Sequence, residues 1–124
     1  DYNAAISSIN SRDYASGNNN IQIAKEKFND AETKLSEIED YQDDLNESVY
    51  KEYIDLIKEE VSLKKQASDE LYLAIQYYAN NDAYSGNSYA QSANNLMKKA
   101  VILQGERNQL VEENSEIFKK AGII

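Results

Sequence analysis

Apolar side chains recur along the chain at alternating intervals of three and four residues, and no stretch sustains an every-second-residue pattern. The first long series covers residues 21–45, the second 50–78 and the third 89–117. Such spacing places the apolar side chains on one face of a helix that packs nearly parallel or antiparallel to its neighbours. The pattern therefore predicts three long amphipathic helices. A shorter helix precedes them, with its apolar side chains at Tyr2, Ala5, Ile6 and Ile9.

A short sequence occurs twice. DYASGN at residues 13–18 returns as DAYSGN at residues 82–87, 69 positions later. Gly17 and Gly86 can take a positive φ, and we predict that they end the first and third helices. We interpret the repeat as two copies of one helical hairpin rather than as a duplicated binding site.

The starts of the following helices are predicted from capping chemistry. Asn19 and Ser88 each precede a Gln by three residues, which is the spacing of a capping box. The turn between the second and third helices falls at residues 43–47, where Asp44 or Asn46 would cap the next helix. Because this turn has neither Gly nor Pro, one bent helix running through it is the alternative.

Four helices joined by short turns should alternate up and down, which predicts an all-α antiparallel bundle whose first helix is short. The turns at 14–18 and 82–88 would lie at one end, and the 43–47 turn and both termini at the other. The terminal end would then hold only three helices, so a homodimer is one expected assembly. The apolar run 100–103 also predicts contact on more than one helix face. Gly105, which follows this run, would mark a kink or a close approach.

The composition argues against several classes of function. With 22 acidic and 13 basic residues the net charge is −9, which disfavours binding to nucleic acid or to anionic lipid. Without His or Cys the chain has no imidazole base, thiol nucleophile or ordinary zinc site. The acidic clusters do not have the spacing of a calcium-binding loop. We therefore expect no enzyme activity, no metal and no cofactor.

The length of 124 residues suits one domain, and we expect residues 1–124 to form a single helical bundle. No apolar run is long enough to cross a membrane, so no direct insertion of this segment is expected. The chain begins with Asp rather than Met, which indicates a fragment of a longer or processed protein. This favours an extracytoplasmic over a cytoplasmic location.

Tyr and Asn concentrate near the end that holds two turns. Such side chains are common in adaptable recognition surfaces, although Asn also favours turns and Tyr also closes the ends of bundles. We predict a non-catalytic interaction or spacer module that presents this surface to a protein partner. We name it the Tyr/Asn tip, and its residues are Tyr14, Tyr77, Tyr78, Tyr84, Tyr89, Asn18 and Asn87.

Polar residues interrupt the apolar series and support an alternative function. These residues are Lys64, Ser68, Arg107 and Asn114. Lys64 and Arg107 could bind the carboxylate of a small molecule between helices, as in an extracytoplasmic ligand-sensing domain. Pairing with Glu60 or Glu106 of the same chain accounts for the two cations equally well.

Overall fold

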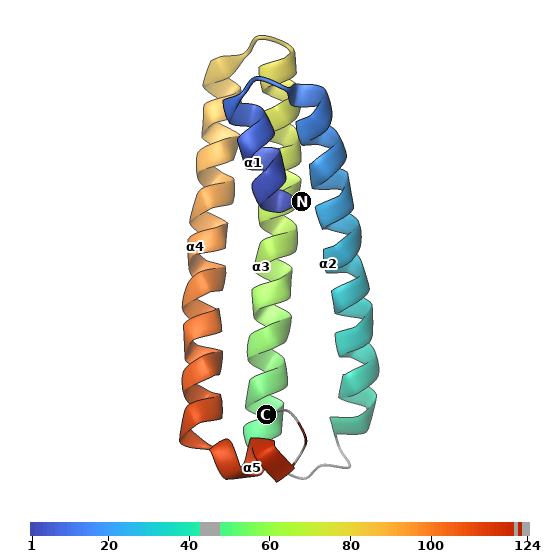
Figure 1. Ribbon diagram of the computed structural model, residues 1–124, viewed down its shortest axis with the longest axis vertical. Helices are drawn as coiled ribbons and strands as arrows, with labels where there is room; N and C mark the ends of the chain where they lie inside the picture. The colour runs from blue at the N-terminus through green and yellow to red at the C-terminus, as the bar shows by residue number, and fades with distance from the viewer. Residues whose placement is uncertain (43–47, 121, 123–124) are drawn as a thin grey trace.

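The computed structural model describes residues 1–42, 48–120 and 122, and its elements there are helices. The long helices are α2 (Tyr14–Gln42), α3 (Ser48–Ala79) and α4 (Ala83–Glu113), with α1 (Tyr2–Asn10) before them and α5 (Ser115–Lys120) after them. Figure 1 shows the long helices side by side, with successive helices running in opposite directions. The prediction of an all-α antiparallel bundle with a short first helix is therefore confirmed.

The arrangement of α2 and α3 decides the question of the second turn. They are separate helices that pack antiparallel, so the alternative of one bent helix is wrong (Figure 1). The proposed caps at Asp44 and Asn46 lie outside the described residues.

The turns at the opposite end begin before their predicted positions. Arg12 and Asn81 take the left-handed conformation, with φ of 62° and 61°. The amides of the next residues, Asp13 and Asp82, donate to carbonyls five positions earlier at 2.8 and 2.9 Å. Each Asp side chain also accepts a bond from the backbone amide three residues later, at 3.2 and 3.1 Å. The repeated sequence therefore forms the same turn and the same Asp cap twice.

Gly17 and Gly86 lie inside α2 and α4, so the prediction that they end helices is wrong. The predicted capping boxes at Asn19 and Ser88 are wrong for the same reason, because both residues are already within a helix. The Asp before each glycine caps the helix instead. Gly86 permits close packing, since a Cβ there would lie 2.6 Å from the Tyr78 ring.

The chain termini also differ from the prediction. α1 has nine residues and spans about 14 Å, whereas the 32 residues of α3 span about 48 Å. The N-terminus therefore lies partway along the bundle rather than at its end (Figure 1). The third long helix was expected to continue through residue 117, but it ends at Glu113 and the chain turns into α5. The Asn114 side chain donates to the Leu110 carbonyl at 2.9 Å, a local bond that competes with continued helix.

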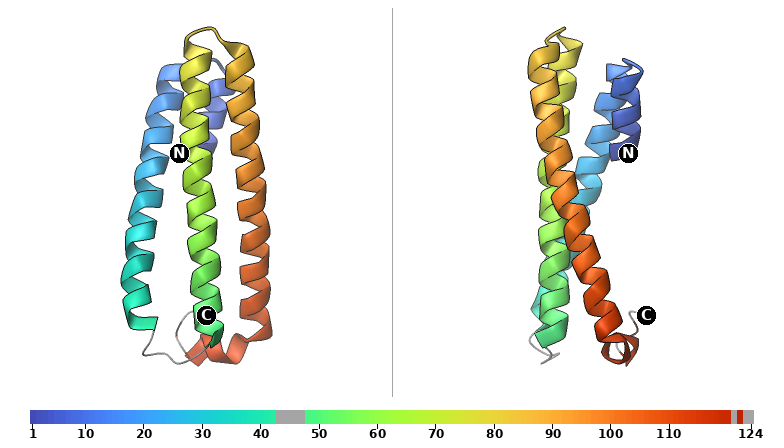
Figure 2. Two further views of the ribbon diagram at one scale, coloured as in Figure 1. Left: turned by 180° about the vertical axis from the view of Figure 1, so that it is seen from behind. Right: turned by 90° about the vertical axis from the view of Figure 1, so that its left-hand side faces the viewer.

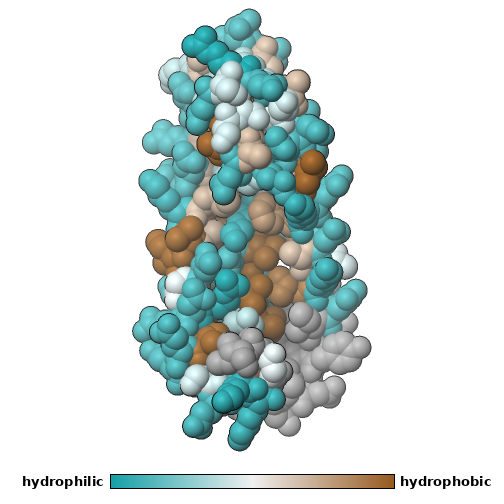
Figure 3. All heavy atoms as spheres, viewed as in Figure 1, coloured by the Kyte–Doolittle hydropathy of each residue, from teal (hydrophilic) through white to brown (hydrophobic). Residues whose placement is uncertain are grey.

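The core occupies the half of the bundle that α1 covers. Its residues are Tyr2, Ala5, Ile21, Ala24, Ala67, Leu71, Ala74, Ile75 and Ala93. Most of them belong to the predicted apolar series, and small Ala side chains let the helices approach closely. Below α1 the bundle has three helices, and Figure 3 shows apolar side chains gathered on this face between α2 and α4.

Candidate functional site

The tip tyrosines come from three helices and meet at the end formed by the two turns. Tyr14 of α2 stacks on Tyr78 of α3, with ring centroids 5.9 Å apart and planes 12° apart. Tyr77 of α3 stacks on Tyr89 of α4, with centroids 5.3 Å apart and planes 7° apart. These separations suit offset-stacked rings. Four of the five predicted tip tyrosines are therefore held in two interhelical pairs.

Hydrogen bonds hold the two asparagines of the tip. The Tyr78 hydroxyl donates to Oδ1 of Asn87, and Gln76 Nε2 donates to Oδ1 of Asn18 at 3.0 Å. Burial, and to a smaller extent the nearby Tyr14, raises the pKa of the Tyr78 phenol. Tyr78 therefore stays a neutral donor well above pH 7. No sequence pattern indicated a role for Gln76, because its partner Asn18 lies on another helix.

Tyr84 differs from the other tip tyrosines. It lies in the first turn of α4 and its side chain is 87% exposed, whereas the other four are partly buried. An aromatic ring in this position offers a large apolar surface with a polar hydroxyl. The structure thus supports the tip with paired rings and leaves one ring projecting into solvent.

Lys64 and Arg107, the candidate ligand-binding pair, meet at a carboxylate of the chain itself. Glu60 is 3% exposed, and Lys64 Nζ lies 3.0 Å from its Oε1. Arg107 Nη1 lies 3.2 Å from Oε2, but off the direction needed for a hydrogen bond. Buried charges require such pairing. Both cations therefore neutralise Glu60, as one of the two sequence interpretations expected, and a ligand carboxylate would have to displace it.

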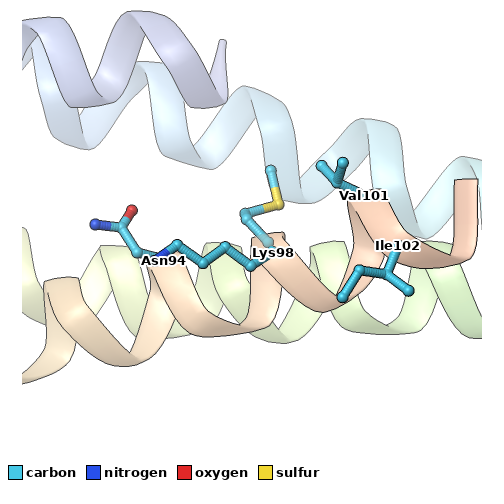
Figure 4. Close-up of a pocket in the computed structure, with 5 residues that line it drawn as sticks. Asn94, Lys98, Val101 and Ile102 are labelled. Carbon is cyan, nitrogen blue, oxygen red and sulfur yellow. The ribbon is translucent and has the colours of Figure 1, made fainter. Parts of the chain in front are cut away.

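A second exposed surface follows the outside of α4. An open hollow of about 580 Å³ lies there, and its lining residues are Asn94, Met97, Lys98, Val101 and Ile102. Figure 4 shows Asn94, Lys98, Val101 and Ile102 arranged along one stretch of this helix. Val101 and Ile102 are each 62% exposed. The sequence indicated this surface only through the apolar run 100–103.

Among the described residues, no three acidic side chains lie close enough together to hold a metal ion. No helix in the same part of the chain is long and apolar enough to span a membrane. Comparison of the chain with protein-family models, with curated proteins and with solved structures gives no match. The residues of the tip and of α4 therefore provide the basis for a functional proposal.

Proposed function

We propose that this protein is a non-catalytic helical interaction and spacer module whose Tyr/Asn tip binds a protein partner. The observation that carries the proposal is Tyr84, an aromatic side chain 87% exposed at the end of a rigid bundle. Tyr is enriched among the residues that contribute most to protein interfaces. A contact centred on this ring would bury it against an apolar pocket of the partner.

The stacked tyrosines beneath Tyr84 support the same proposal. Binding costs free energy when mobile side chains become ordered, at about 0.5–1.5 kcal/mol for each flexible side chain. The Tyr14–Tyr78 and Tyr77–Tyr89 stacks already fix four rings before any partner arrives. The tip would therefore bind as a preformed surface.

The long helices supply the spacer part of the function. α3 alone spans about 48 Å from Ser48 to the tip turn, without Gly or Pro. Ion pairs between Lys25 and Asp69 at 3.0 Å, and between Lys65 and Glu32 at 2.9 Å, join α2 to α3 along this length. Helices of this length, joined by these ion pairs, would hold the tip well away from the other end of the bundle.

To test whether the tip is the binding surface, protein binders are selected from a displayed library of the source organism's own proteins. Their affinities are then measured for this protein and for its variants. We expect Tyr84→Ala to weaken the selected complexes at least about tenfold, because a buried aromatic anchor contributes more than about 1.4 kcal/mol. Lys119→Ala, an exposed change in α5 at the opposite end of the bundle, is the control and should bind as the parent does. Circular dichroism should show equal helicity for all three proteins. Equal affinities for Tyr84→Ala and the parent would reject the tip as the binding surface.

A thermal-unfolding screen against small metabolites separates this proposal from the ligand-sensing alternative. A ligand that binds only the folded state raises the unfolding midpoint by mass action. Since Glu60 already pairs with Lys64 and Arg107, we expect no compound to shift the midpoint. A reproducible shift that disappears in Arg107→Gln would favour the sensing function instead.

A further inference from the structure

The outer face of α4 carries an apolar centre that the rest of the chain does not cover. Lys98, Val101, Ile102 and Gly105 follow one another at i, i+3, i+4 and i+7, so they share one side of the helix. Ala93 and Ala100, which face the core, are 0% exposed. In the right-hand view of Figure 2, α4 runs across the front of the molecule with no other element over it. On the side away from its core face, α4 therefore carries a small exposed apolar patch, formed by Val101 and Ile102.

Gly105 is a second unusual feature of this face, beside the exposed Val101 and Ile102. It lies in the interior of α4, where glycine costs about 1 kcal/mol relative to alanine. A Cβ added at Gly105 would meet nothing within 4 Å, so no neighbour in the described part of the chain requires its absence. A bare backbone one turn from Val101 and Ile102 suits the close approach of another helix from outside.

The charges on α4 are arranged on opposite sides of this apolar centre. Lys98 and Lys99 precede Val101 and Ile102 in the chain, and Glu106 follows them. Within the described residues, none of these three charged side chains forms an ion pair. Lys99 and Glu106 are seven residues apart and so lie on the same flank of the helix.

We propose that the outer face of α4 binds the same face of a second copy of this chain, with the two helices antiparallel about a twofold axis beside Val101 and Ile102. In an antiparallel pair the same flanks meet, so Lys99 of each copy lies opposite Glu106 of the other. A parallel pair would instead bring opposite flanks together, so Lys99 would not face Glu106 of the other copy, and Lys98 at the centre of the face would lie against Lys98 of the other copy. The sign pattern on α4 is therefore complementary to itself only in the antiparallel orientation.

The contact would extend over much of α4. An axis beside residues 101 and 102 lets roughly residues 91–113 of both helices overlap, about 35 Å at 1.5 Å per residue. The net charge of −9 on each copy opposes association over long distances. At physiological salt the screening length is about 8 Å, so the repulsion between distant charges of the two copies is weakened more than the Lys99–Glu106 attraction across the contact.

Such a dimer has a functional consequence. Tyr84 lies outside the overlapping part of α4, and the antiparallel arrangement places the two tips at opposite ends of the particle. The dimer would join two tip partners at a fixed separation. The dimer itself does not depend on the function proposed for the tip.

Sedimentation velocity at physiological salt tests the assembly. We expect a concentration-dependent species of twice the 14.1 kDa chain mass. The double variant Val101→Glu, Ile102→Glu should weaken the dimer more than about tenfold, because it places four acidic side chains, two from each copy, around the twofold axis. Leu73→Glu alters another exposed apolar residue, on α3, and should leave the dimer intact. Tyr84→Ala should also leave it intact, which separates this surface from the tip.

Cysteine pairing tests the orientation, since the chain has no native cysteine. Under mild oxidation, a mixture of Lys99→Cys and Glu106→Cys chains should form a covalent heterodimer in preference to either homodimer. Preferential cross-linking of each variant with itself would contradict the antiparallel register, which sets residue 99 of one copy against residue 106 of the other, and would overturn the proposal. It would also be overturned by a monomer at every concentration, or by a dimer that survives the double glutamate variant, since either result places no second copy on this face.

Discussion

Gly17 and Gly86, which occupy equivalent positions in the repeated sequence, meet different surroundings. A Cβ at Gly86 would lie 2.6 Å from ring atoms of Tyr78, too close for any carbon contact. At Gly17 the nearest atoms would be Ser8 Cβ at 3.5 Å and the Ala5 carbonyl oxygen at 3.6 Å, which are ordinary contacts. The same residue type is therefore required in one copy of the hairpin and optional in the other.

This difference predicts opposite effects of one substitution. Gly86→Ala should lower the free energy of unfolding by about 1–3 kcal/mol, because the Tyr78 ring and its stack on Tyr14 must shift. Gly17→Ala should raise it by up to about 1 kcal/mol, since alanine restricts the unfolded chain and fits the space. Urea denaturation of both variants measures the two values. A loss at Gly17 equal to that at Gly86 would contradict this account.

Tyr2 carries a buried hydroxyl with no hydrogen-bond partner among the described residues. Burial of this phenol raises the pKa of Tyr2 from 10.0 to about 12. The unfolded chain therefore loses the Tyr2 proton before the folded protein does. Its effect on stability is constant below pH 10, and stability is lost as the pH rises toward 12.

Tyr2→Phe should remove this dependence. At neutral pH we expect the variant to be as stable as the parent or more stable by up to about 1 kcal/mol, because no hydrogen bond is lost. Between pH 10 and 12 its advantage should grow by about 2–3 kcal/mol, at roughly 1.4 kcal/mol per unit of pKa. Denaturation curves of the two proteins across this pH range measure the effect of Tyr2 alone, because the proteins have every other titrating group in common. Parallel pH profiles would show that the Tyr2 phenol is not desolvated.

At the scale of elements, α5 connects the end of α4 to the beginning of α3. Phe118 is 0% exposed, and its ring centroid lies 5.6 Å from Tyr50 and 5.0 Å from Tyr53. The Tyr50 hydroxyl donates to the Ile117 carbonyl at 2.8 Å. This short helix closes the end of the bundle that α1 does not reach.

Phe118→Ala should lower the free energy of unfolding by about 3 kcal/mol, as expected for the loss of a fully buried aromatic ring. Lys119→Ala, an exposed change in the same helix, should stay within about 0.5 kcal/mol of the parent. Chemical denaturation gives both values. If the two variants are equally stable, α5 does not close the bundle in solution.

At the scale of the molecule, burial is uneven along the bundle axis. The core cluster lies in the half where α1, α2, α3 and α4 all pack, whereas Leu35, Ile54, Ala100 and Phe118 are the buried apolar residues beyond α1. Regions with fewer buried contacts open at lower free energy. The two halves should therefore differ in local stability.

Amide hydrogen exchange measures this difference. Within α3, the amides of Leu71, Ala74 and Ile75 should exchange at least about tenfold more slowly than that of Ile54. The comparison lies inside one continuous helix, so helix propensity alone does not produce it. Uniform protection along α3 would show that the bundle opens as one unit.

The sequence by itself determined the helices and their buried faces. A side chain's place on a helix depends only on local spacing, and Ile21, Leu71 and Ala93, one from each of the three apolar series, are buried in the core. The turn chemistry was harder to predict, because Asp and Gly are both plausible turn residues. The backbone at Arg12 and Asn81 decided between them.

Only the tertiary structure decided which distant side chains meet. The stack of Tyr77 on Tyr89, the contact of Arg107 with Glu60 and the packing of Phe118 on Tyr53 each join different helices. Their distances depend on how the helices are rotated and shifted against one another, which no spacing within a single helix specifies. For the same reason, the sequence alone does not show that Tyr84, Val101 and Ile102 are exposed, because their exposure depends on which faces of α4 the other helices cover.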